Sequence, residues 1–310
     1  MPTLLDYRRR IRSVKSTQQI TRAMKFISAA KLRRAQEGVF AARPYAGEIL
    51  RVMRSAAARM ESAAHPLLER RPEERILVVV LTGDRSLAGA FNTNVIRRAI
   101  LFIHENSSKK SQMIAIGKKG RDALRKRGWT IAGEYLNVSA KVDFSIAKEI
   151  AGKIAEMYAA REVDAMYAVY NEFKNVMVQK LRTAKLLPID PGILNEESAE
   201  KTGMSAAEES ALPHDLSASG KAQLVDYIYE EPVEEIFSGL VPRYLEAEVF
   251  RILLESAAAE HAARMTAMDS ATRNASDLID ALTLDMNKIR QASITKELIE
   301  IVSGAASAKS

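Results

Sequence analysis

The two ends of the chain show helical periodicity over long stretches. No glycine or proline occurs between Thr3 and Glu37 or between Arg243 and Ser303. Because these two residue types break helices most effectively, each stretch is predicted to form one long helix. The second helix would be about 90 Å long at roughly 1.5 Å per residue, which no single compact domain of this size could enclose.

Small and apolar residues in both stretches recur at steps of three and four, the spacing of a coiled-coil seam. In the C-terminal stretch the predicted seam consists of Ala271, Ala275, Leu278, Leu282, Met286 and Ile289. In the N-terminal stretch it consists of Leu4, Ile11 and Gln18 with Tyr7, Val14, Thr21 and Ser28, widened by Ile20, Met24 and Ile27. Because helices at opposite ends of one chain meet most simply in antiparallel orientation, we expect a helical hairpin.

The middle of the chain changes to strands that alternate with helices. Short β-branched runs predict strands over 75–82, 111–117, 164–170 and 176–187, and helices are predicted over 94–105, 118–126 and 145–161. This alternation indicates βαβ units in a Rossmann-like, mainly parallel sheet. The predicted fold class is therefore α/β with a long antiparallel coiled coil, in which the N- and C-terminal helices form a hairpin shaft beside a central sheet domain.

These signals divide the chain into five segments. We expect an N-terminal shaft helix in 1–65, a central α/β domain in 66–189 and a C-terminal shaft helix in 232–310. The segment 190–224 is acidic and poor in apolar residues, so it is predicted to be a mobile insertion. Residues 225–231 would then form the last strand of the α/β domain.

Composition narrows the chemistry available to the chain. It has no cysteine, which excludes disulfides, thiolate nucleophiles and sulfur-ligated zinc. Its four histidines are far apart in sequence, so no metal or other cofactor is predicted. The apolar runs are shorter than the roughly 20 residues that span a bilayer, and no signal peptide is recognisable. We therefore expect a cytoplasmic protein that is soluble or peripheral to a membrane.

Charge is distributed unevenly along the chain. The first 60 residues hold 14 Lys and Arg against three Asp and Glu, whereas residues 190–240 hold two against 12. A basic helix suits an acidic protein surface, a nucleic acid or anionic lipid, although a solvated helix face would have the same composition.

Three short features are compatible with chemistry, and each also has a structural interpretation. Asp84 follows a predicted strand and could hold Mg²⁺, but no second carboxylate is near it in sequence, which favours a cap and turn. The run 117–120 (GKKG) resembles the GxxG clamp of a KH domain, yet it follows a strand and is more typical of a turn. His261 lies in an alanine-rich helix and is expected on the seam or the surface.

No catalytic triad or HExxH motif can be assembled from the sequence, so no active site is predicted. The polar end of the C-terminal helix is the more informative feature, because a rod would meet a partner there. Arg290 can form forked bonds to carboxylates, Gln291 can bond backbone groups, and Thr295 lies with them near the free end of the helix. A solvated helix end would have the same composition.

The N-terminal run 11–25 (IRSVKSTQQITRAMK), followed by 28–31 (SAAK), closely resembles the opening helix of the gamma subunits of rotary, F-type ATP synthases of the bacterial type. The run 290–298 (RQASITKEL), with 300–305 (EIVSGA), resembles the C-terminal signature of the same family. The resemblance extends from about Leu5 to Ala306 and is interrupted by the acidic insertion.

The resemblance implies a non-catalytic central-stalk rotor subunit of a proton-translocating ATP synthase, which transmits rotation between the membrane c-ring and the catalytic alpha/beta ring. Matching positions imply that the alpha/beta ring is contacted by Met24, Lys25, Arg264, Arg290, Gln291 and Thr295. They imply that the c-ring or the epsilon subunit is contacted by Tyr227, Tyr229 and Glu230. They also imply a peripheral position on the cytoplasmic face of the bacterial plasma membrane, with neither cofactor nor nucleic acid.

One departure from the family pattern concerns Ser86, which stands where the turn after the first strand usually has glycine. Two alternatives also remain from the residues alone. A basic coiled-coil nucleic-acid-binding or adaptor protein would bind with strong salt dependence. An α/β phosphate-handling enzyme centred on Asp84 would show turnover as the isolated chain.

Overall fold

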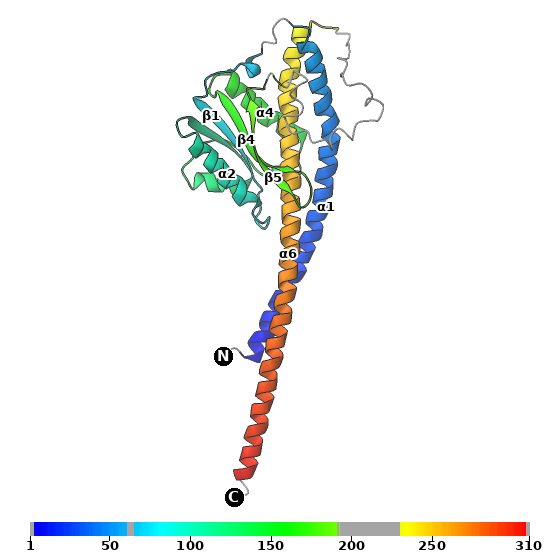
Figure 1. The fold of residues 1–310 in the computed structure, drawn as a ribbon, viewed down its shortest axis with the longest axis vertical. Helices are drawn as coiled ribbons and strands as arrows, with labels where there is room; N and C mark the ends of the chain where they lie inside the picture. Colours follow the sequence, from blue (N-terminus) through cyan, green and yellow to red (C-terminus); the bar gives the residue numbers. More distant parts are fainter. Residues whose placement is uncertain (1–2, 61–64, 191, 193–229, 308–310) are drawn as a thin grey trace.

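The computed structural model describes residues 3–60, 65–190, 192 and 230–307. Two long helices, α1 (Leu4–Ala57) and α6 (Val233–Ser307), lie side by side as a shaft, and a sheet domain packs against one flank of it (Figure 1). The chain begins partway along the shaft and ends at the far tip of α6. The predicted fold class is confirmed.

Helix α1 begins with a capping box, in which Thr3 Oγ1 accepts a hydrogen bond from the Asp6 N–H and the Asp6 carboxylate accepts one from the Thr3 N–H. The helix continues through Gly38 and Pro44 because its seam continues, and Pro44 lies on the exposed side. Buried and partly buried side chains alternate at steps of three and four along its whole length, namely Leu4, Tyr7, Ile11, Val14, Gln18, Thr21, Lys25, Ser28, Leu32, Ala35, Val39, Ala42, Ala46, Ile49, Met53 and Ala56.

Three residues were wrongly predicted to lie on the seam. Ile20 and Ile27 are each 58% exposed, because each precedes a seam residue and a step of one residue turns a side chain about 100° around the helix. In α6, Leu278 is 48% exposed and Ile279 takes its place. Regular alternation of steps of four and three from Ala275 leads to 279, which the sequence pattern alone did not distinguish from 278.

The central sheet has five strands in the order β3-β2-β1-β4-β5, where the first four are parallel and the last is antiparallel. The strands are β1 (Arg75–Leu81), β2 (Lys110–Ile116), β3 (Ile131–Tyr135), β4 (Ala165–Phe173) and β5 (Gln179–Leu187). The connecting helices are α2 (Phe91–Glu105), α3 (Lys118–Arg125) and α4 (Phe144–Ala159), with short 3-10 turns at Pro66–Leu68 and Val138–Ala140. The edge strand β3 was not predicted.

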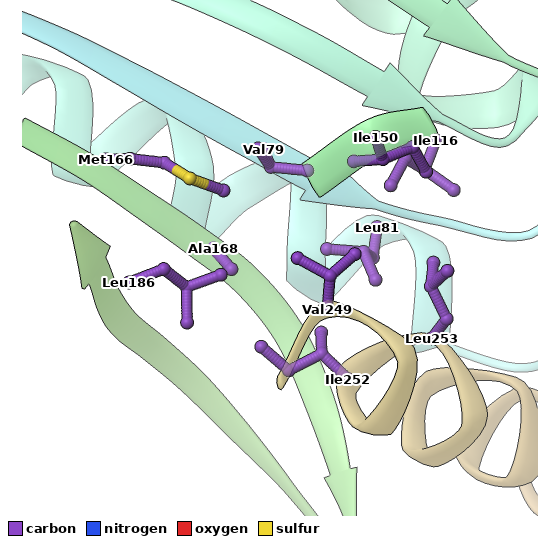
Figure 2. Close-up of a pocket in the computed structure, with 10 residues that line it drawn as sticks. All are labelled: Val79, Leu81, Ile116, Ile150, Met166, Ala168, Leu186, Val249, Ile252 and Leu253. Carbon is purple, nitrogen blue, oxygen red and sulfur yellow. The ribbon is translucent and has the colours of Figure 1, made fainter. Parts of the chain in front are cut away.

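The shaft and the sheet share one hydrophobic core. Helices α4 and α6 cover one face of the sheet, and α2 and α3 cover the other. Val249, Ile252 and Leu253 of α6 point toward the strands and help to line a small apolar pocket between helix and sheet (Figure 2). Ile49 and Met53 of α1 belong to the same core. Shaft and domain are therefore built as one body.

A polar cluster gathers at the amino end of the sheet around Glu73. Its carboxylate accepts hydrogen bonds from Lys109 (2.8 Å), Lys185 (2.7 Å) and the Tyr167 hydroxyl (2.9 Å). Burial raises the pKa of Glu73, but these three hydrogen bonds outweigh it and hold the pKa at about 2. The cluster thus ties the first segment of the domain to three strands or loops.

The acidic insertion falls outside the described residues from 193 onward, and so does most of the strand predicted over 225–231. Glu230 and Glu231 form a bend that leads into α6. The predicted last strand therefore stays a prediction.

Candidate partner-contact surface of the shaft

The crevice at the carboxyl ends of the strands, where doubly wound folds bind ligands, is filled by the chain itself. Thr82, which follows β1, and Ser139 of the 138–140 turn meet Ser256 and Glu260 of α6 there. In the part of the chain that the structure describes, no group of three or more potential metal ligands comes together.

Asp84 and the GKKG run are joined in a turn. Asp84 Oδ1 accepts a hydrogen bond from the Lys118 N–H (3.0 Å) at the start of α3. The Thr82 hydroxyl oxygen accepts one from the Gly120 N–H (2.8 Å). Gly117 has φ 90°, and a Cβ there would lie 2.0 Å from the Thr82 carbonyl oxygen. These contacts account for Asp84 and for the glycines as parts of the fold.

The turn after β1 does not require glycine at position 86. Its left-handed residues are Leu87 (φ 67°) and Gly89 (φ 55°). Ser86 is not among the residues with positive φ, so serine fits this conformation without strain.

His261 of α6 is buried, with 6% of its surface exposed. Burial lowers the pKa of His261, so the imidazole is neutral at neutral pH. Its Nδ1 has no hydrogen-bond partner among the described atoms. Of the two positions expected for His261, the surface position was wrong, and the seam position stays a prediction.

Met24 and Lys25 are both partly buried, in a part of α1 whose seam residues are polar. Lys25 Nζ pairs with Asp269 of α6, which also binds Arg273. One turn away, the Thr272 hydroxyl donates a hydrogen bond to the Thr21 hydroxyl (2.8 Å). Lys25 is 38% exposed in its side chain, so it contributes to the hairpin and is still accessible to a partner.

Arg264 differs from the other predicted contacts because its side chain is only 11% exposed. Its guanidinium binds the Glu260 carboxylate at 2.7 Å. The structure thus places Arg264 between the shaft and the sheet domain, and a contact with a ring of partner subunits stays a prediction.

The free tip of α6 carries Arg290, Gln291 and Thr295, all exposed. This part of α6 extends past the beginning of α1 as a single helix (Figure 1). It also displays apolar side chains that the sequence analysis did not single out, each 50–67% exposed: Ile294, Leu298, Ile299, Ile301 and Val302. The usable signal was a group of large apolar residues on a helix that continues beyond the end of its seam partner.

Of the residues predicted to contact the c-ring or the epsilon subunit, Glu230 alone lies within the described part of the chain. Tyr227 and Tyr229 lie outside the described residues, and Glu230 is exposed in the bend before α6. No helix among the described residues combines the length and the apolar character that crossing a membrane requires.

Comparison with known proteins gives concordant matches. The family model described as ATP synthase matches residues 3–308. The ATP synthase gamma chain of Solibacter usitatus is 51% identical, and the alignment covers 100% of both chains. The ATP synthase gamma chain of Pelotomaculum thermopropionicum is 46% identical, with 99% of each covered. A chain in the rotor of the Euglena gracilis mitochondrial ATP synthase matches with a TM-score of 0.59 and 22% identity, over 94% of this chain and 98% of that one.

The fold, a two-helix shaft built into the face of a mainly parallel sheet, is thus shared with a chain of that rotor. Full-length identity near one half goes further than fold. The chain belongs to the gamma-chain family of ATP synthases. The function predicted from the sequence, a non-catalytic central-stalk subunit, is confirmed, and the nucleic-acid-binding and phosphate-handling alternatives are not supported.

Proposed function

We propose that this chain is the rotor shaft of a proton-translocating ATP synthase. A c-ring turns it at its foot, the end near Glu230, and a ring of alpha and beta subunits contacts its tip, the C-terminal end of α6. The observation that carries the proposal is the single core that α1, α6 and the sheet share. A body with one continuous core turns as a unit, so rotation applied to the domain reaches the tip.

The ring contacts are proposed on the outward side chains of the shaft. Arg290, Gln291 and Thr295 stand exposed on the free tip, with donors suited to acidic and backbone groups. Met24 and Lys25 would face an acidic segment of a beta subunit farther down. The exposed apolar side chains of the tip support the same assignment, since a helix with such a surface requires an apolar surrounding.

The proposed mechanism depends on shape and stiffness. An eccentric hairpin inside a ring of three equivalent beta subunits contacts each one differently and favours a different conformation in each. Rotation of the shaft then exchanges these conformations in sequence. Catalysis would belong to the ring, and this chain would set only the order of events.

The proposed partners at the foot are the epsilon subunit and the c-ring, reached through the region of Tyr227, Tyr229 and Glu230. This arrangement would hold the chain peripherally at the cytoplasmic face of the plasma membrane, through the complex. The basic first helix supports an acidic protein partner in the ring and requires no nucleic acid.

Co-purification from the native host tests the proposal. The chain is tagged, isolated in mild detergent, and its partners are identified while ATP hydrolysis is assayed. We expect alpha, beta, epsilon and c subunits, with hydrolysis in the complex and none in the free chain. Recovery of nucleic acid without these subunits, or hydrolysis by the free chain, would contradict it.

A further inference from the structure

The level at which α6 leaves the sheet domain is unusual in its contacts. The large apolar core that joins α6 to the sheet ends near Leu253. Two small apolar clusters follow. One consists of Ala88, Phe91 and Ala259, and the other consists of Leu32, Ala258 and Ala262, with Phe173 of the sheet packed against both. Beyond this level α6 runs along α1 as a rod (Figure 1). At the junction between domain and rod, α6 therefore contributes small apolar side chains, mainly alanines, where the core above it has valine, isoleucine and leucine.

A buried ion pair occupies this junction. Glu260 is 3% exposed, and its carboxylate carbon would lie 2.6 Å from a Cβ built on Gly83, so the carboxylate takes the place of a side chain there. Arg264 binds this carboxylate at 2.7 Å, and its other contact is the Arg85 carbonyl oxygen at 3.5 Å. We call Gly83, Glu260 and Arg264 the exit clamp.

The loop that receives Glu260 is itself held in place. The Gly83 N–H donates to Asn92 Oδ1 at 2.8 Å, and Asn92 Nδ2 donates to the Arg85 carbonyl at 3.3 Å. The carboxylate thus rests on a loop anchored to the first turn of α2. A rotation of α6 about its axis would move Glu260 off this seat.

The energetics favour a role in orientation. Apolar contacts between alanines are non-directional and tolerate small rotations of a helix. A buried ion pair adds little net stability over an apolar replacement, but it has one geometry in which its charges are paired. An ion pair buried among these small apolar side chains is thus suited to setting an angle.

We infer that Glu260 is a positioning residue that fixes the rotational setting of α6 against the sheet domain, so that twisting of the shaft begins beyond the exit clamp. This inference rests on the proposed rotor function. It assigns Arg264 to the holding of Glu260 within the chain.

Because the chain has no cysteine, a single Lys126→Cys substitution on the exposed end of α3 gives a unique attachment point for a rotation probe. The complex is fixed by its ring, the rotor is paused, and the angular spread of the probe is recorded. The variants are Glu260→Gln, which keeps the shape and removes the charge, and Gly83→Ala, which removes the seat. Glu248→Gln is the matched control, since Glu248 pairs with Arg251 on the same helix at 2.8 Å.

We expect both clamp variants to widen the angular spread, while the control matches the unchanged chain. In Glu260→Gln, assembly yield and ATP hydrolysis should be retained while the angular spread widens. If the role of Glu260 were purely structural, all three would change together. An unchanged spread in both clamp variants would overturn the clamp alone. Failure of the unchanged chain to assemble into the ring would overturn the rotor function and the clamp with it.

Discussion

A proline in the middle of the shaft gives a direct test of the need for a straight, stiff α6. Ala275 lies on the seam and is 8% exposed, so a side chain there cannot avoid α1. Proline at this position removes the hydrogen bond of its N–H and places its ring against the preceding turn, at a cost of about 3 kcal/mol or more. The helix is expected to kink there instead of unfolding, because both halves remain packed.

The size of the displacement follows from the length of α6. The helix continues for 32 residues beyond Ala275, to Ser307. This is about 48 Å at roughly 1.5 Å per residue. A kink of about 20°, the lower end for proline, would move the tip sideways by about 16 Å. Such a tip could not stay near the axis of a surrounding ring.

The assay compares Ala275→Pro with Ala275→Gly in the assembled complex. Glycine costs about 1 kcal/mol in a helix and introduces no ring clash, so it controls for local destabilisation. We expect proton-driven ATP synthesis to be lost in the proline variant and largely kept in the glycine variant. Full synthesis with proline at 275 would refute the account of torque by shape and stiffness.

Three further predictions concern the sheet domain and can be read from unfolding. The pKa of Glu73 is about 2 in the folded protein, below its usual 4.5, so its contribution to the free energy of unfolding is present above about pH 4.5 and is lost as the pH falls toward 2. Glu73→Gln should therefore make stability less dependent on pH in that window, and an unchanged acid-unfolding profile would contradict this. Gly117→Ala should destabilise by at least about 1–3 kcal/mol, because φ is 90° and the Thr82 carbonyl blocks a Cβ; a wild-type denaturant midpoint would count against this. Ser86→Gly should lower the free energy of unfolding by about 0.4–1 kcal/mol, because glycine gives the unfolded chain more conformational freedom. Leu87→Gly should be tolerated better, because it removes a left-handed leucine whose strain costs about 1–2 kcal/mol. The reverse order in thermal melts would show that the turn is misassigned.

Much of the fold could be predicted because its signals are local. Long stretches without glycine or proline predicted both shaft helices, and β-branched runs predicted four of the five strands. The edge strand β3 was missed because its five residues include Gly133 and Glu134, and its pairing with β2 supplies what its composition lacks. Edge strands of this kind depend on a neighbour that the sequence does not reveal.

The candidate site was harder to predict because exposure depends on distant parts of the chain. Arg264 and Arg290 have the same charge and lie on the same helix, yet one is bound between shaft and sheet and the other is free at the tip. That difference arises because the sheet domain packs near the first half of α6 alone. Periodicity shows which face of a helix is apolar, and it does not show where a covering domain ends.

The uninterrupted course of α6 also encodes an angle. Each residue of an α-helix turns the chain by about 100°, so the orientation of the tip relative to the sheet domain is set by the number of residues between them. Inserting one residue after Glu260 would turn the tip by about 100°, whereas inserting seven would leave it about 20° short of two full turns. The rotational phase between the two ends of the molecule is therefore a matter of counting, and insertions or deletions of single residues in this helix should be far more damaging than substitutions at the same positions.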